Sequence, residues 1–303
     1  MSLQAKGVIS VLPTPFHQDG SLDLASLRRI IDLFLAGGVN GFTVLGVTGE
    51  VARLTDPERA QVLDAVIRHV DGRVPVVVGA TAEGLHACIE YSRQAKAAGA
   101  AAVMVSPPRM PKLNSESVVA HYRTLAETVG IEIVVQDYPP ISGFTMEAAL
   151  LARIAKEVPG AGIIKLEDAP TPLKTAQILQ RANGTPISIL GGLGGVYLLE
   201  ELLAGAAGAM TGFAYPEMLV DVIRRFHGGK VEEAADAFYR YVPLMRFEFQ
   251  QGIGMAIRKE MLRRRGVMEC AAIRPPGPVL DSSTSLALDH LINSMRRQGV
   301  PWV

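Results

Sequence analysis

A lysine at the end of an apolar segment is the residue of this sequence best suited to covalent chemistry. The run at 161–165 (AGIIK) ends in Lys165, and Glu167 and Asp168 follow closely. An ammonium at the end of a buried strand is costly unless it is paired or deprotonated. Desolvation lowers the pKa of a lysine, and the neutral amine can attack a carbonyl to form a Schiff base. The alternative is that Lys165 reaches the rim and pairs with Glu167 or Asp168.

A glycine-rich turn is the second chemical feature. After an apolar run at 41–45, the sequence continues with Gly46, Val47, Thr48, Gly49 and Glu50. The backbone amides of such a turn, with the Thr48 hydroxyl, can bind a carboxylate. Alone this string is a weak signal. Together with a lysine at the end of another strand, it indicates a pocket for a 2-keto acid, in which the turn holds the carboxylate and the amine captures the carbonyl.

A regular alternation of elements would position these groups. Short runs rich in Val, Ile and Gly predict strands at 8–12, 41–45, 74–78, 101–105, 131–136, 161–165, 186–190 and 207–211. Apolar spacing near 3.6 predicts helices at about 23–37, 56–70, 83–98, 115–129, 146–157, 171–182, 194–204 and 216–227. Eight strand–helix units predict an α/β fold, the (β/α)8 TIM barrel. An open doubly wound sheet would carry a dinucleotide turn after its first strand, where this chain has the stiff segment 12–16 (LPTPF).

The pattern changes near residue 228. Helical spacing dominates at 231–249, 254–265 and 285–297, and a proline-rich connector lies at 274–278. We therefore expect residues 1–227 to form the barrel and residues 228–303 to form a C-terminal helical appendage. That appendage would either pack on the barrel or build a subunit interface.

Composition excludes several classes of protein. The 303 residues include 30 Lys+Arg and 30 Asp+Glu, so the chain has no net charge, and a nucleic-acid partner is not expected. No apolar run approaches the roughly 20 residues that cross a bilayer, and we expect no membrane association and a cytoplasmic protein. Cys88 and Cys270 lack metal-site spacing, and the histidines show no HxH or HExxH pattern, so no metal is expected.

The turn at 46–50, the segment 13–16, Lys165 and the C-terminal helices together resemble the dihydrodipicolinate synthase / N-acetylneuraminate lyase family, over about residues 7–300. Members of that family are (β/α)8 barrels, commonly tetrameric, that form a lysine Schiff base with pyruvate or a longer 2-keto acid. The resemblance implies that Lys165 is the Schiff-base lysine and that Thr48 and its neighbouring amides bind the carboxylate. It also implies a 2-keto acid substrate, no cofactor beyond the covalent Schiff base, and a homotetramer or dimer.

Several positions depart from the synthases of that family. Val47 replaces the first of two hydroxyls in the turn. Alignment of the proline and the downstream glycine puts Gln136 at the position of the strand-five tyrosine, and we therefore expect it among the catalytic residues with Lys165 and Glu167. A shift of two residues would instead put Tyr138 there on the same strand face. The tyrosine pair after strand four is replaced by the segment 106–109 (SPPR), and the arginine that binds the second carboxylate aligns with Ile141. We therefore expect no role in lysine biosynthesis.

Glu167 is the candidate that replaces the missing proton relay. It lies two residues beyond Lys165, so strand alternation sends both side chains to one side, where a carboxylate can act as general acid and base. The alternative is that it only pairs with a charged Lys165. A K-x-E sequence without the tyrosine is similar to the family's dehydratases of 2-keto-3-deoxy pentonates.

We therefore expect a lyase that dehydrates a 2-keto-3-deoxy sugar acid, such as 2-keto-3-deoxy-arabinonate. A pyruvate-dependent aldolase or a synthase-like enzyme is the alternative, and a non-catalytic barrel that binds a keto acid is a further one. Gly191 and Gly192, in the loop after strand seven, are expected to line the pocket through backbone contacts. Because many barrels bind phosphate there, a phosphorylated substrate is the rival interpretation. Tyr138 and Met210 complete the expected substrate contacts.

Overall fold

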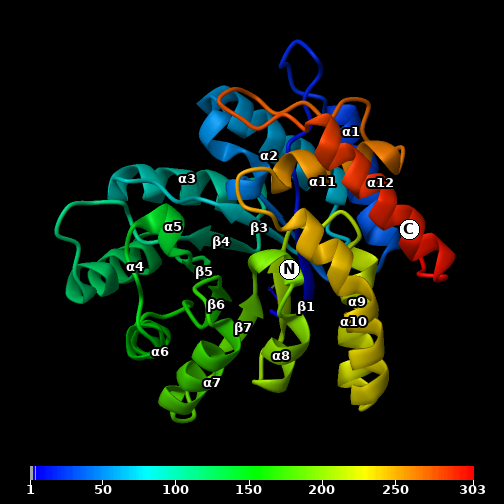
Figure 1. Cartoon of the computed structure of the whole chain (residues 1–303). Helices are drawn as coiled ribbons and strands as arrows, with labels where there is room; N and C mark the ends of the chain where they lie inside the picture. Colours follow the sequence, from blue (N-terminus) through cyan, green and yellow to red (C-terminus); the bar gives the residue numbers. More distant parts are fainter. Residues whose placement is uncertain (1–2, 4) are drawn as a thin grey trace.

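The computed structural model describes residue 3 and residues 5–303, and within this part eight parallel strands close into a barrel (Figure 1). Each strand pairs with the next in the chain, and the last pairs with the first. The strands are β1 (Gly7–Val11), β2 (Gly41–Val44), β3 (Val76–Gly79), β4 (Ala102–Val105), β5 (Glu132–Asp137), β6 (Ile163–Leu166), β7 (Ser188–Gly191) and β8 (Gly208–Thr211). This confirms the predicted (β/α)8 fold.

Helices follow the strands around the outside of the barrel. They are α1 (Leu24–Ala36), α2 (Asp56–Val70), α3 (Leu85–Ala98), α4 (Ser115–Val129), α5 (Pro139–Ser142), α6 (Ala148–Glu157), α7 (Thr171–Ala182), α8 (Leu198–Leu203) and α9 (Pro216–His227). Three short 3₁₀ turns, η1 (Val47–Gly49), η2 (Val51–Arg53) and η3 (Leu193–Gly195), lie in the loops of the described chain. Sequence patterning did not predict α5 or these turns, which are too short for a helical period.

Apolar side chains form two separate clusters. The inner one fills the barrel with Ile9, Val11, Val77, Ala102, Met104, Val134, Ile163, Leu190 and Met210. The outer one lies between strands and helices, and α1 contributes to it at the spacing i, i+3, i+4 and i+7 with Leu27, Ile30, Ile31 and Phe34. Because successive strand residues point to opposite sides, every strand except β2 contributes to both clusters, whereas β2 contributes only Phe42 and Val44 to the outer one.

Some predicted boundaries were wrong, each for a local reason. β3 begins at Val76 and not at 74, after Pro75. The helix expected at 194–204 begins only at Leu198, because Gly194 and Gly195 both have φ near +70°, which an α-helix does not accept. The last helix begins at Ser282 and not at 285, since Asp281 caps it by accepting from the Thr284 amide at 2.9 Å.

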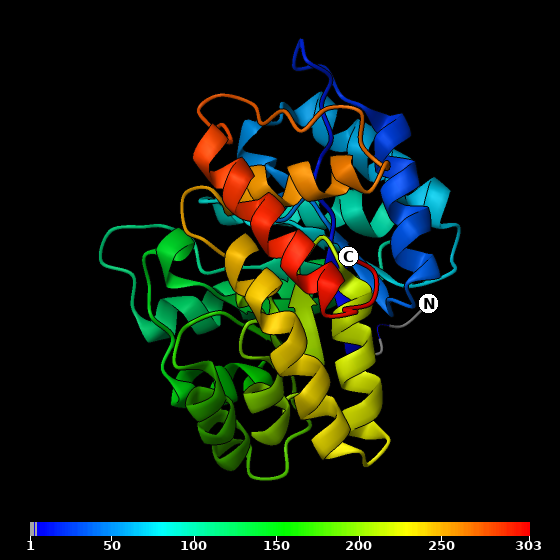
Figure 2. The same cartoon turned by 45° about the vertical axis from the view of Figure 1, so that its right-hand side comes forward.

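The C-terminal region consists of α10 (Val231–Glu248), α11 (Gly254–Arg264) and α12 (Ser282–Arg297). Figure 2 shows α10 lying beside α9, and α10 also contacts α12. α10 also contacts α8, α11 and η3. The region therefore packs on the barrel; the division into units 1–227 and 228–303 stays a prediction. Within the described residues, no helix has both the length and the apolar character needed to cross a membrane.

Candidate active site

Lys165 lies in the barrel at the end of β6, with its ammonium beside a carboxylate. Its Nζ is 3.0 Å from Glu167 Oε2, and both side chains are largely buried. Gln136 pairs with Lys165 in the β5–β6 register, and its Nε2 donates a hydrogen bond of 2.7 Å to the same Glu167 oxygen. The structure thus brings the three predicted catalytic residues into one contact group.

A polar chain extends this group across β4. The Ser106 hydroxyl donates to Gln136 Oε1 at 3.1 Å, and the Ser106 amide donates to Thr81 Oγ1 at 2.9 Å. Because its Oε1 accepts from Ser106, Gln136 presents its NH₂ group to Glu167, and this fixes the orientation of the amide. Sequence reasoning noted Ser106 only as part of the segment that replaces a tyrosine pair; its contact with Gln136 was missed.

The predicted carboxylate turn is the 3₁₀ turn η1. The amides of Gly49 and Glu50 close it by donating to the carbonyls of Gly46 and Val47, each at 3.0 Å. The amides of Val47 and Thr48, at the start of the turn, lie outside its own hydrogen bonds. Within residues 5–303, no group hydrogen-bonds the buried Thr48 Oγ1. These three donors suit a carboxylate. Gly49 is fixed by a separate contact, because the Thr14 hydroxyl donates to its carbonyl at 2.6 Å.

The glycine pair at the end of β7, Gly191 in the strand and Gly192 directly after it, makes room for two carboxylates. A Cβ on Gly192 would lie 2.2 Å from Glu167 Cγ, and a Cβ on Gly191 would lie 1.8 Å from Glu201 Oε2. Both glycines are therefore needed for space, a role that the sequence did not predict; their backbone contacts with a substrate stay a prediction. The glycine loop after β7 was also the alternative phosphate site. In the structure, the Gly194 amide of this loop donates to Thr211 Oγ1, and a Cβ on Gly194 would clash with Phe249.

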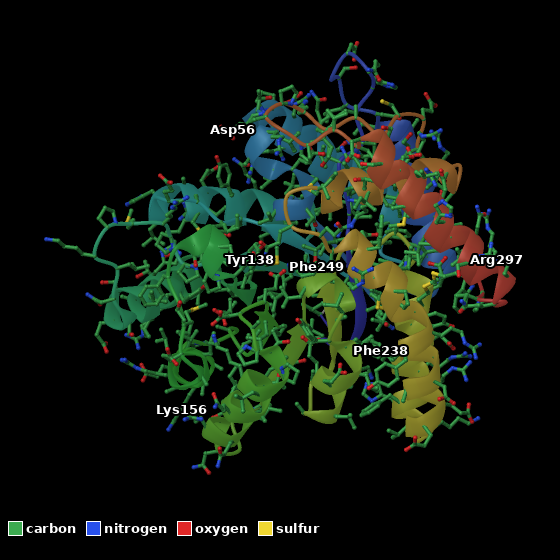
Figure 3. All side chains as sticks on the ribbon, viewed as in Figure 1. Asp56, Tyr138, Lys156, Phe238, Phe249 and Arg297 are labelled. Atoms are coloured by element: carbon green, nitrogen blue, oxygen red, sulfur yellow. The ribbon has the colours of Figure 1, made fainter. Side chains whose placement is uncertain are left out.

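The two remaining predicted contacts lie at different depths. Tyr138 is half-buried at the start of α5 (Figure 3), and burial, together with the negative Glu167, raises the pKa of its phenol. Met210 is fully buried in the inner apolar cluster. Whether either residue touches a substrate stays a prediction.

Buried charges also lie behind the strand ends. Lys174 Nζ contacts Asp137 Oδ2 at 2.5 Å and Asp168 Oδ2 at 2.7 Å. Burial raises the pKa of Asp137 to about 6, although the bonded Lys174 opposes this shift.

A second buried acid lies on α8. Glu201 accepts from the Thr171 hydroxyl at 2.6 Å, and burial raises its pKa to about 7. Neither Lys174 nor Glu201 has a spacing to Lys165 that would have revealed it in the sequence.

A cavity of about 790 Å³ lies over this edge of the barrel, between the loops that follow β2 to β5. The residues that line its wall include Gly46, Val47, Ser106 and Gln136, and Arg59 and Arg109 are among its charged residues.

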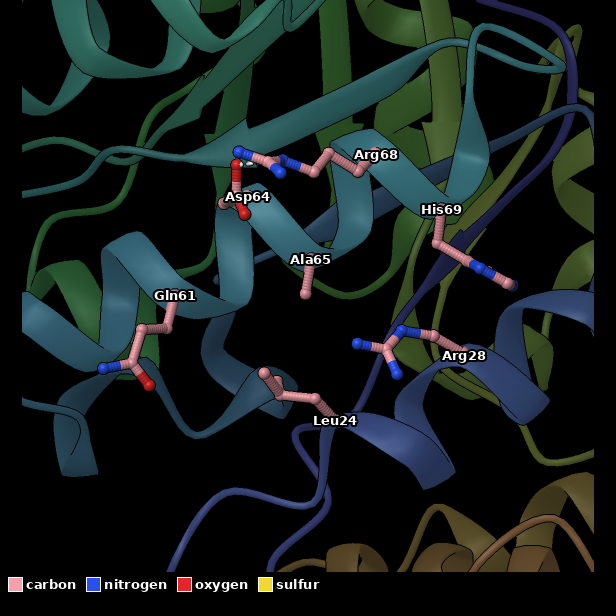
Figure 4. Close-up of a pocket in the computed structure, with 7 residues that line it drawn as sticks. All are labelled: Leu24, Arg28, Gln61, Asp64, Ala65, Arg68 and His69. Atoms are coloured by element: carbon pink, nitrogen blue, oxygen red, sulfur yellow. Dashed lines mark hydrogen bonds and ion pairs between the residues drawn. The ribbon is translucent and has the colours of Figure 1, made fainter.

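A separate hollow lies between α1 and α2 (Figure 4). It contains no strand end and is not part of this site. Its lining residues are Leu24, Arg28, Gln61, Asp64, Ala65, Arg68 and His69.

Among the described residues, one group of side chains has ligand atoms close enough to hold a metal ion: His17, Asp23 and Glu269. Asp23 is already engaged as the cap of α1, because its carboxylate accepts from the amide and hydroxyl of Ser26. This group contains none of the predicted site residues. The absence of a metal from the candidate site stays a prediction.

Comparison with known proteins decides the family. The model of the dihydrodipicolinate synthetase family matches residues 4–295. The chain belongs to this family. An L-2-keto-3-deoxyarabonate dehydratase from Azospirillum brasilense is 31% identical to it, over 93% of this chain and 92% of the relative. A 4-hydroxy-tetrahydrodipicolinate synthase from Stenotrophomonas maltophilia strain K279a is 30% identical, over 95% and 96%.

Solved structures agree with this assignment. A dihydrodipicolinate synthase from Rhodopseudomonas palustris superposes with a TM-score of 0.91 at 34% identity, covering 97% of this chain and 99% of that one. The family resemblance is confirmed. The protein is accordingly an enzyme, a lyase of the dihydrodipicolinate synthetase family, whose members bind small keto acids.

Adding one methyl group at Gly192 tests the geometry of the site. Because the Cβ of Gly192→Ala would overlap Glu167 Cγ, the carboxylate has to move away from Lys165, and we expect turnover to fall about 100-fold. Gly84→Ala is the matched control, since its Cβ meets nothing within 4 Å. Initial rates and melting temperatures of both variants check this. Equal rates for the two folded variants would contradict the packing argument.

Glu201 predicts a pH dependence of stability. Its pKa is raised from 4.5 to about 7, so its contribution to the free energy of unfolding is fully present below pH 4.5 and is lost as the pH rises through 7. Relative to Glu201→Gln, the wild type should lose on the order of 2–3 kcal/mol between pH 5 and pH 8. Urea unfolding at both pH values measures this. Because Asp137 titrates in both proteins, its effect on the difference cancels. If the free energies of unfolding of the two proteins changed equally with pH, the raised pKa of Glu201 would be refuted.

Proposed function

We propose that the enzyme forms a Schiff base through Lys165 and dehydrates a 2-keto-3-deoxy sugar acid, such as 2-keto-3-deoxy-arabinonate. The observation that carries this proposal is the 3.0 Å contact between Lys165 Nζ and Glu167 Oε2, in a site where Gln136 takes the place beside Lys165. An amide neither gains nor loses protons near neutral pH, so Gln136 can orient Glu167 but cannot relay a proton. Proton transfer then falls to Glu167. The similarity to the Azospirillum dehydratase supports the substrate class.

The first steps use the two halves of the site. The substrate carboxylate binds the Val47 and Thr48 amides and the Thr48 hydroxyl, which places its C2 carbonyl near Lys165. Glu167 takes a proton from the ammonium, and the free amine attacks C2. The carbonyl oxygen leaves as water, with one hydrogen from the amine and the proton that Glu167 returns, so that a protonated imine and an ionised Glu167 remain. Its positive charge makes the C3 hydrogen acidic.

The dehydration itself needs one residue in two roles. Glu167 removes the C3 proton, and the electron pair forms an enamine. That pair then expels the C4 hydroxyl, which leaves as water with the proton that Glu167 returns. The product is a conjugated imine with a C3=C4 double bond. Water hydrolyses it and regenerates Lys165.

A pyruvate-dependent aldolase or a synthase-like reaction is the alternative, because these share the imine step and most of the similar curated relatives are synthases. An aldolase would break the C3–C4 bond and release pyruvate. The departures from the synthase pattern, with Ile141 at the position of the arginine and Gln136 beside Lys165, favour dehydration. A cytoplasmic location and a homotetramer or dimer stay predictions.

Borohydride trapping tests the Schiff base. Reduction in the presence of pyruvate, followed by peptide mass spectrometry, should place the adduct on Lys165, and Lys165→Met should give none. An adduct on Lys174 instead, or no adduct with pyruvate or a longer keto acid, would refute the covalent step.

Glu167→Gln tests the proposed base. Its amide keeps the shape but cannot accept the C3 proton, so we expect the dehydration rate to fall by about 10² to 10⁴-fold. Because Glu167 also takes the proton from the Lys165 ammonium in the proposed mechanism, the pyruvate adduct should form more slowly, with water as the proton acceptor, but long incubation with borohydride should still trap it on Lys165. Screening 2-keto-3-deoxy sugar acids for water loss against pyruvate release measures both reactions. A variant with the full rate would show that Glu167 is not the base, and pyruvate as the main product would favour the aldolase.

A further inference from the structure

The carboxylate turn ends in a buried acid that binds the C-terminal region. Glu50 follows η1 with φ 57° and ψ 29°, the left-handed conformation that non-glycine residues rarely adopt. Its carboxylate forms an ion pair with Lys259 of α11, and both side chains are fully buried. The residues are 209 positions apart in the sequence, which gave no sign of this contact.

Lys259 is held in place by several groups. Its Nζ donates to the Ala272 carbonyl at 2.8 Å and lies 4.5 Å from the centre of the Phe16 ring. Burial lowers the pKa of Lys259, whereas the neighbouring Glu50 opposes this change. The Arg274 amide donates to Glu50 Oε2 at 3.2 Å, and its guanidinium lies 4.4 Å from the same ring. Two segments of the C-terminal region therefore converge on one carboxylate.

α11 reaches a second loop of the barrel in the same way. Arg258 Nε contacts Glu248 Oε1 at 2.5 Å, and the guanidinium fills the space beside Gly212, just after β8. Glu248 Oε2 in turn accepts from the Ala214 amide at 2.9 Å. Consecutive cations on α11 thus fix loops that follow β2 and β8, both at the end of the barrel that carries Lys165.

A buried ion pair is weak evidence for stability, because desolvation of both charges opposes their attraction. Its geometry, however, is demanding, and a charge left alone in the interior is very unfavourable. Glu50 is covalently adjacent to the turn that carries Thr48 and the free amides. Any displacement of Glu50 would therefore shift the donors that are proposed to bind the substrate carboxylate.

We propose that Lys259 is a positioning residue: by pairing with Glu50 it sets the conformation of the turn at 46–50, so that the C-terminal region controls recognition of the substrate carboxylate. This inference rests on the proposed function, since it takes η1 as the carboxylate site. The C-terminal appendage would then position the carboxylate turn of its own chain.

The test compares a keto acid with its neutral ester. The concentration for half-maximal borohydride trapping on Lys165 is measured for pyruvate and for methyl pyruvate, in the wild type, in Lys259→Met and in Lys96→Met. Lys96 is the matched control, because its Nζ bonds the Val129 carbonyl between α3 and α4, away from the turn. We expect the wild-type preference for pyruvate over the ester to fall about tenfold or more in Lys259→Met and to be unchanged in Lys96→Met.

Each other outcome is decisive. Equal loss for both ligands in Lys259→Met, or no loss, overturns the positioning role while leaving the Schiff base intact. No adduct in the wild type refutes the proposed function itself. If Lys259→Met does not fold, the double variant Glu50→Gln/Lys259→Met, which leaves neither charge unpaired, is measured instead with the same expectation. A double variant that also fails to fold shows that the pair serves folding and overturns the inference.

Discussion

Placing an ammonium at the end of a buried strand is the constraint on which the rest of the site depends. Lys165 needs a partner in a region that water hardly reaches, and Glu167 provides it from two residues further along the chain. The carboxylate then needs space, which Gly192 supplies, and a donor that holds it in one orientation, which Gln136 supplies. Residues in or next to four strands, β4, β5, β6 and β7, thus contribute to the surroundings of the Lys165 ammonium.

The C-terminal region holds a second loop of the site in place, the turn that follows β2. A 3₁₀ turn that ends in a left-handed glutamate is unfavourable in isolation. Buried contacts from Lys259 and from the Arg274 amide hold the glutamate in this conformation. The barrel supplies the strand ends, but part of the geometry of its loops comes from residues more than 200 positions away. Function and long-range packing are therefore difficult to separate in this chain.

Local patterns were sufficient for the architecture and for part of the site. Apolar periodicity located the strands and the long helices, and Lys165 and Glu167 were apparent because strand alternation relates neighbours in sequence. Long-range contacts had no such signal. Glu201 reaches Gly191 from α8, Lys259 reaches Glu50 from α11, and nothing in their spacing predicts either contact. The pairing of Gln136 with Lys165 also needed the β5–β6 register, which a single sequence does not contain.

The close approach of Gly192 to Glu167 has a consequence for reading related sequences. In a barrel of this geometry the two positions are not independent, because the acid fits only where its neighbour has no side chain. A relative with the K-x-E sequence but a larger residue at the second glycine would need another arrangement of this loop. Barrels that move protons in the way proposed for this site are therefore expected to combine both features, and not to carry the glutamate alone.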